Sequence, residues 1–225
     1  MDVPVREAAT VLVVRDGGDG LEVLMLRRTT AAVFSPGAHV FPGGALDDDD
    51  RSAAMAARCA ARVNPDASGG LAFFVAAVRE CFEEAGVLLA RGIDGELLRL
   101  DDPDVAGRFE QHRRAVHGGE RRFVDICVDE SLELAVDALH PFGHWITPPG
   151  GPRRFDTRFF ITQAPAAQEA VHDDHETTEH GWYRPADMLA AHRRGEVDLI
   201  LPTERSLLVI ADARTVDEVL QEAAA

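Results

Sequence analysis

Basic residues are scarce in this chain of 225 residues: 23 Lys and Arg stand against 39 Asp and Glu, which gives a formal net charge of −16. Contacts to phosphate need Lys and Arg, so a chain this acidic repels nucleic acid and anionic membranes, and neither is an expected partner. Long apolar runs are also missing, since no stretch approaches the roughly 18 residues that a membrane-spanning helix needs. Residues 1–7 lack the basic and then apolar segments of a secretory signal.

Cysteine is equally rare. The chain has three cysteines, Cys59, Cys81 and Cys127, an odd number at wide spacing. This pattern argues against a disulfide framework and against a CxxC zinc site, and it is typical of reduced thiols. With lipidation signals also absent from both ends, we expect a cytoplasmic protein.

The residues that are present indicate a packed protein, because 46% of them are hydrophobic. Two segments rich in Val and Leu, residues 8–15 and 21–28, flank the turn-forming residues 16–20 and predict a β-hairpin. A short strand is expected at residues 38–41, where Pro42-Gly43-Gly44 ends it.

The rest of the chain mixes helices and strands. An Ala-rich run behind four acids predicts a helix from 47 to 62, and residues 71–85 predict a strong helix that Gly86 ends. The other expected elements are helices at 105–117, 123–139, 185–194, 202–213 and 215–224, strands at 145–147 and 155–162, and a polar loop at 166–181. No repeat or long linker interrupts them. We therefore expect one α+β domain over residues 1–225, with a mixed sheet and a C-terminal helical part at about 202–225.

The helix at 71–85 carries an unusual acidic stripe. At about 100° per residue, Glu80, Glu83 and Glu84 fall on one side of it, opposite the apolar residues. Three carboxylates at this spacing repel one another, and a hard divalent cation such as Mg²⁺ or Mn²⁺ would resolve the repulsion. The plain alternative is a solvated acidic face.

Two segments together resemble the signature of the Nudix hydrolase family. The first is Phe41-Pro42-Gly43-Gly44, and the second is residues 79–87, which match the pattern REUxEExGU, where U is a bulky apolar residue. Cys81 departs mildly from the first U. The resemblance implies a Nudix fold, with a mixed β-sheet sandwiched between helices, and metal-dependent hydrolysis of a pyrophosphate bond.

The spacing inside this signature departs from the usual pattern. Gly44 stands 35 residues before Arg79, whereas the usual box places that Gly 14 residues before its Arg, so about 21 residues are inserted. The usual box also has a Glu six residues after the Gly. Counted forward from Gly44, this position is Asp50, and counted back from Arg79 it is Leu71. The role of the box Glu is therefore assigned to neither residue. We expect the insertion, at about residues 47–70, to form the Ala-rich helix.

A narrower resemblance covers most of the chain. Residues 34–44, 77–89 and 153–157 resemble a Nudix branch that includes a mammalian peroxisomal coenzyme A diphosphatase and that carries a long insertion in the box. The branch favours coenzyme A or acyl-coenzyme A as substrate. Two markers are missing. The chain ends in Glu222-Ala223-Ala224-Ala225, which is no peroxisomal address, and Val33 stands where another set of coenzyme A Nudix enzymes has an Arg.

The resemblance also implies roles for individual residues. Glu80, Glu83 and Glu84 would bind Mg²⁺ or Mn²⁺ together with the carbonyl of Gly43, and Glu83 would serve the catalytic step as well. Arg79 would orient a glutamate without touching the substrate.

The family often adds a remote acid from a loop before a late Trp-bearing strand. Glu176, six residues before Trp182, is the candidate for metal ligand or general base, with Glu179 as the alternative. A zinc site is a further reading of this loop, which has histidines at His172, His175 and His180.

Two arginines are candidates for phosphate contacts. Arg28 follows the second expected strand and Arg154 precedes a later one, and basic groups in so acidic a chain suit an anionic nucleotide. The alternative is that both are surface arginines paired with the many acids.

Three functions follow from these residues. The first is cleavage of coenzyme A or acyl-coenzyme A into 3',5'-ADP and a phosphopantetheine. The second is cleavage of ADP-ribose, NADH or a similar small-molecule nucleotide. The third is a Nudix-fold regulator that binds a ligand without catalysis, although such proteins usually lose the box glutamates. The oligomeric state stays open, with a homodimer among the choices.

Overall fold

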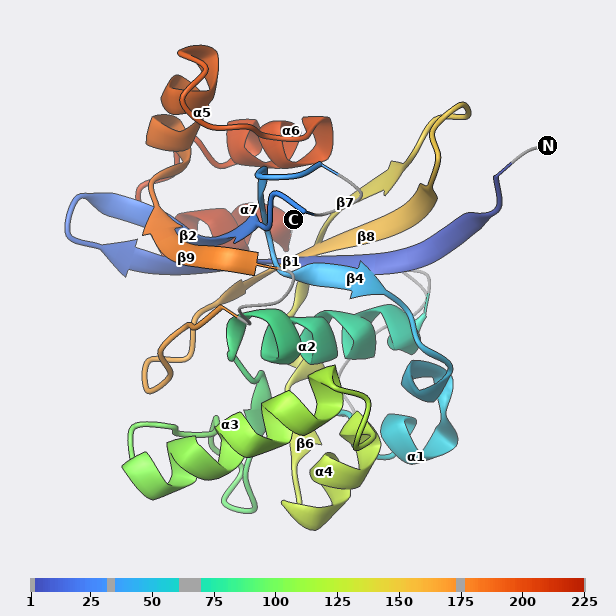
Figure 1. The fold of residues 1–225 in the computed structure, drawn as a ribbon. Helices are drawn as coiled ribbons and strands as arrows, with labels where there is room; N and C mark the ends of the chain where they lie inside the picture. The colour runs from blue at the N-terminus through green and yellow to red at the C-terminus, as the bar shows by residue number, and fades with distance from the viewer. Residues whose placement is uncertain (1–2, 32–34, 61–69, 173–176, 225) are drawn as a thin grey trace.

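The structure, a computed structural model, describes residues 3–31, 35–60, 70–172 and 177–224. In these ranges seven strands form one mixed sheet, and helices cover both of its faces (Figure 1). The Nudix-type α+β architecture expected from the sequence is therefore confirmed. None of the described helices combines the length and apolarity needed to cross a bilayer.

The sheet is mixed because its central strand, β1, has both parallel and antiparallel neighbours. β1 (Val5–Gly17) forms the predicted hairpin with β2 (Gly20–Arg28) and runs parallel to β8 (Arg154–Gln163). β7 (His140–Ile146) is antiparallel to β8 at one edge, and β9 (Thr177–Tyr183) is antiparallel to β2.

β1 and β2 separate beyond their hairpin, and one segment fills the gap between them. β3 (His39–Val40) pairs with β2, and β4 (Gly43–Ala45) pairs with β1. Between them the carbonyl of Pro42 accepts a hydrogen bond from Val11 N at 2.9 Å. The glycines of the Phe41-Pro42-Gly43-Gly44 segment are thereby fixed in the sheet on the side where the acidic helix packs.

Side-chain alternation along the strands divides the core into two parts. On β1, Val11 and Val13 face α2 (Leu71–Ala85), whereas Leu12 and Val14 face the opposite layer. The opposite layer consists of α5 (Pro185–Arg193), α6 (Leu201–Val209) and α7 (Val216–Ala223). Figure 1 shows α2 below the sheet and these three helices above it.

A second helical layer covers α2 from outside. α3 (Pro103–His117) begins at Asp102, whose side chain accepts from the N–H groups of Asp104 and Val105, and α4 (Phe123–Asp129) follows it. The rings of Phe82 and Phe123 lie 6.0 Å apart between the layers. α2 is thus buried on two sides, which leaves its acidic stripe at the margin.

Two expected helices are wrong as predicted. Instead of a helix over 47–62 there are a 3-10 helix, η1 (Asp48–Arg51), and a one-turn helix, α1 (Ala53–Ala56); residues 61–69 lie outside the described ranges. The helix expected over 123–139 stops at Asp129, because Ser131 adopts a φ of 53° and the chain then forms a strand. That strand, β6 (Glu133–Leu134), pairs with β5 (Ala90–Arg91) and is followed by a 3-10 helix, η3 (Val136–Ala138).

The loop expected at 166–181 is wrong in its second part, since β9 begins at Thr177. β9 reads as polar because most of its side chains are exposed or only half-buried, and its backbone pairing with β2 is what makes it a strand. The strand expected at 145–147 begins earlier, at His140. The other expected elements are present, with ends that differ by a few residues.

Candidate active site

Arg79 is the centre of a buried charge cluster on α2. The exposed fraction of Arg79 is 5%. Asp50 lies far away in the sequence, and its exposed fraction is 3%. Arg79 Nε donates to Asp50 Oδ1 at 3.0 Å and Nη2 donates to Oδ2 at 2.9 Å, a two-pronged pair. Nη2 also donates to the carbonyl of Ala45 at 3.0 Å. The pair with Asp50 joins α2 to η1, and the hydrogen bond to Ala45 joins α2 to β4.

The third guanidinium nitrogen of Arg79 holds two of the stripe glutamates. Nη1 donates to Glu80 Oε1 at 2.9 Å and to Glu83 Oε1 at 3.1 Å. Burial raises the pKa of Glu80 to about 7, although Arg79 opposes the shift, and burial raises the pKa of Glu83 in the same way. Arg79 therefore orients both carboxylates but only partly offsets the cost of burying them.

The glycines of β4 allow close contact with the carboxylates of Glu84 and Glu80. Gly43 N donates to Glu84 Oε2 at 2.9 Å, and Glu84 is buried. At Gly44 a Cβ atom would lie 2.5 Å from Glu80 Oε1, far inside van der Waals contact. A side chain at position 44 would therefore displace the Glu80 carboxylate.

This donor set suits a hard divalent cation. Three acids, Asp50, Glu80 and Glu83, bond to one cation, Arg79, and Glu84 lies on the same helix, so the cluster has surplus negative charge and offers carboxylate oxygens. Among the described residues no three His, Cys, Asp or Glu side chains converge on a common point. In this arrangement Glu80 and Glu83 bond to Arg79, and Glu84 bonds to the Gly43 N–H.

Arg28 and Arg154 lie on strands on opposite sides of β1, each at the strand end away from the β1–β2 turn. Arg28 ends β2, where its N–H donates to the carbonyl of Ala38 at 2.9 Å. Arg154 begins β8 beside Val5, five positions along β1 from Thr10, the partner of Gly43, which corresponds to roughly 16 Å. Its Nε donates to the carbonyl of Thr147 at 3.1 Å.

The candidates before Trp182 are only partly visible. Glu176 and His175 lie outside the described ranges. Glu179 is paired with Arg27, with Oε2 at 3.3 Å from Nη1, and this pair is exposed.

His172 and His180 lie next to each other, with their Nδ1 atoms 2.8 Å apart. Of the three histidines in the hypothesis of a zinc site, these two are the ones that the structure describes.

Two residues of the cluster went unassigned in the sequence. Asp50 stands six residues after Gly44, where the usual box has its Glu, and this spacing was its signal in the sequence. The buried pair with Arg79 distinguishes Asp50 from Leu71, the other residue considered for that position. Arg113, on α3, had no sequence signal. Its Nη1 donates to the carbonyl of Glu83 at 3.0 Å, and Glu110 holds its guanidinium.

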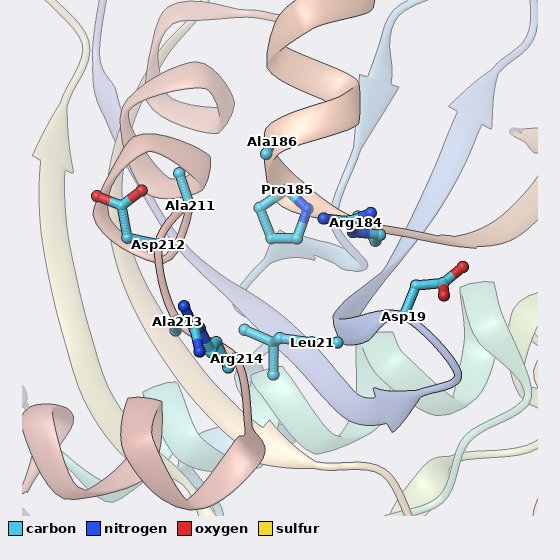
Figure 2. Close-up of a pocket in the computed structure, with 10 residues that line it drawn as sticks. Asp19, Leu21, Arg184, Pro185, Ala186, Ala211, Asp212, Ala213 and Arg214 are labelled. Carbon is cyan, nitrogen blue, oxygen red and sulfur yellow. The ribbon is translucent and has the colours of Figure 1, made fainter.

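A separate hollow of about 320 Å³ lies on the other face of the sheet, between the β1–β2 turn, the start of α5 and residues 211–214. Figure 2 shows Asp19 and Arg184 on one side of it and Asp212 and Arg214 on the other. The sheet separates this hollow from α2, so it belongs to a different region from the carboxylate cluster.

The cluster agrees with what comparison with known proteins finds. A family model described as the NUDT19 Nudix domain matches residues 55–206. The chain belongs to the Nudix hydrolase family. The family and the branch predicted from the sequence are both confirmed.

Curated Nudix relatives match over most of this chain. Human "Acyl-coenzyme A diphosphatase NUDT19" is 31% identical over 82% of this chain and 59% of its own length. The chicken protein of the same name is 29% identical over 88% of this chain and 65% of its own length. The chain therefore spans about three fifths of the length of these relatives.

A solved Nudix structure extends the agreement to the fold. The crystal structure of a NUDIX hydrolase from Alicyclobacillus acidocaldarius is 30% identical, with a TM-score of 0.79. The match covers 97% of this chain and 96% of that one.

Proposed function

We propose that this protein hydrolyses the pyrophosphate bond of coenzyme A or acyl-coenzyme A, giving 3',5'-ADP and a phosphopantetheine or its acyl form. The observation that carries the proposal is the set of carboxylates on the helix that bears the Nudix signature: Glu80 and Glu83 bonded to Arg79, and Glu84 bonded to Gly43 N. The names of the curated relatives, which are acyl-coenzyme A diphosphatases, support this substrate class.

Hydrolysis of a pyrophosphate requires positive charge beside the negatively charged phosphates. A pyrophosphate repels an attacking water or hydroxide, so the reaction needs cations beside it. A bound Mg²⁺ or Mn²⁺ would supply that charge and would lower the pKa of a water. Glu80, Glu83, Glu84 and the carbonyl of Gly43 are the groups that would hold it. The surplus negative charge of the cluster fits this role.

The protein's own residues then have separate tasks. Arg79 holds Glu80 and Glu83 in one orientation through a single nitrogen, Nη1. Glu83, and Glu176, which directly precedes β9 in the sequence, are the acids that we assign to proton transfer with water. In the reaction the oxygen of water bonds to one phosphorus, the bridging P–O bond breaks, and the bridging oxygen leaves with the other phosphate. Arg28 and Arg154 are the arginines that we assign to the substrate phosphates.

The test is a comparison of substrates. Purified protein is incubated with Mg²⁺ or Mn²⁺ and, separately, with coenzyme A, octanoyl-coenzyme A, ADP-ribose and NADH, and the products are identified by mass. We expect 3',5'-ADP from the coenzyme A compounds. Preferred cleavage of ADP-ribose or NADH would keep the hydrolase and discard this substrate, and absence of turnover with all four would favour the ligand-binding regulator.

A further inference from the structure

A large cavity lies beside the last turn of α2. Its volume is about 840 Å³, within the usual range for small-molecule sites. Its walls are the end of α2, α3, and the segment 166–172 that precedes β9. Figure 1 shows α3 running beneath α2.

The cavity and the carboxylate cluster share the same turn of α2. Arg113, which lines the cavity, donates from Nη1 to the carbonyl of Glu83. Val171 N donates to the carbonyl of Ala85 at 2.9 Å, and a Cβ at Gly86 would lie 2.6 Å from Val171 Cγ2. A substrate held by its pyrophosphate at the glutamates would therefore have one end close to this cavity.

The far wall is fixed by hydrogen bonds. Gln168 Oε1 accepts from Leu88 N at 2.8 Å, while its Nε2 donates to the carbonyls of Leu88 and Leu98 at 3.0 and 2.9 Å. The side-chain amide thus ties the 166–172 segment to the chain after α2.

The lining does not suit a phosphate group. Three acids, Asp101, Glu110 and Glu169, outnumber the two arginines among the described residues of the lining. Both arginines are bonded to Glu110: Arg113 Nε at 2.7 Å and Arg114 Nε at 2.7 Å. A nucleotide with its 3'-phosphate would meet a net negative wall here.

The remaining lining is mostly apolar and neutral. Phe82, Leu100, Ala106 and Val171 contribute apolar surface. Burial, and then the neighbouring His172, lowers the pKa of His180, so its ring is neutral at pH 7. A mostly uncharged ligand with some polar atoms matches these walls.

We propose that this cavity binds the uncharged arm of the substrate, the pantetheine chain with any acyl group on its sulfur, and leaves the phosphorylated nucleotide to the other side of the glutamates. The proposal rests on the proposed function, since it assigns the two halves of that substrate. It makes the cavity the part of the site that distinguishes coenzyme A compounds from nucleotides without such an arm.

Gly107 offers a clean way to close the cavity. It lies inside α3 and lines the cavity, and a Cβ added there meets no atom within 4 Å. Gly107→Leu therefore starts its side chain in open space beside the cavity, and it removes a residue that weakens helices. Gln111→Leu is the matched control, because Gln111 is an exposed residue of the same helix that is not part of the lining.

The experiment separates binding from turnover. Octanoyl-pantetheine, which carries no phosphate, is titrated into wild type, Gly107→Leu and Gln111→Leu by calorimetry. We expect binding to wild type and to Gln111→Leu, and binding at least about tenfold weaker to Gly107→Leu. Absence of binding to wild type, or equal binding by all three proteins, would overturn the proposal.

Kinetics provide the second readout. We expect Gly107→Leu to raise the KM for octanoyl-coenzyme A about tenfold, with kcat nearly unchanged, and Gln111→Leu to leave both unchanged. An effect on kcat alone would contradict a role in holding the arm. If wild type hydrolyses no coenzyme A compound, the proposed function fails, whereas the titration still decides whether the cavity accepts the arm.

Discussion

The buried pair between Arg79 and Asp50 allows a quantitative prediction. Asp50→Asn keeps the size of the side chain but removes its charge, so Arg79 loses a partner at 2.9 and 3.0 Å. Removal of one member of a buried ion pair costs about 3–5 kcal/mol. Arg79 keeps Glu80 and Glu83 as partners, so we expect a loss of about 3 kcal/mol in the free energy of unfolding, at the lower end of that range.

The assay is urea unfolding followed by circular dichroism, with the slope against urea expected to stay unchanged. Asp49→Asn is the control, since the Asp49 side chain is 41% exposed and lies 3.8 Å from Arg122, a pair worth less than about 0.5 kcal/mol. Asp50→Glu, which restores the charge, should recover part of the loss. A cost below about 1 kcal/mol for Asp50→Asn would refute the reasoning, because it would mean that the buried guanidinium does not need this partner.

Three further predictions concern the carboxylates. Glu83→Gln and Glu84→Gln should abolish nearly all turnover while the circular dichroism spectrum is retained, whereas a protein that only binds its ligand has no turnover to lose. Because burial raises the pKa of Glu80 from 4.5 to about 7, the metal-free protein should lose stability as pH rises from about 4.5 to 7, and Glu80→Gln should flatten this dependence in thermal unfolding scans. Gly44→Ala should lower kcat by displacing Glu80, while Gly143→Ala, whose Cβ meets its nearest atom at an ordinary 3.9 Å, should not.

Local patterns were enough to predict the catalytic helix. The apolar spacing of residues 71–85 fixed its buried face, and Gly86, at a φ of 68°, ends it as expected. The three glutamates lie together for the same reason, since their relation depends only on helical geometry. Their closeness to Gly43 and Gly44 is a long-range contact, which the sequence indicated through the family signature and not through periodicity.

Elements that depend on pairing between distant segments were harder to predict. β9 carries few apolar residues, so only its register with β2 shows that it is a strand. Likewise, the chain after α4 forms β6 because Leu134 pairs with Ala90, a contact that helical periodicity cannot report. Arg113 belongs to the same class, since its role depends on how α3 packs against α2.

The insertion in the Nudix signature shows why extra chain length need not disturb the site. Asp50 stands six residues after Gly44, the usual spacing of the box Glu, and it reaches Arg79. If the connection between Gly44 and Arg79 grows from 14 to 35 residues, closing the longer loop costs roughly 0.8 kcal/mol more. Breaking the Asp50–Arg79 pair costs about 3 kcal/mol. The pair therefore outweighs the added cost of closing the longer loop.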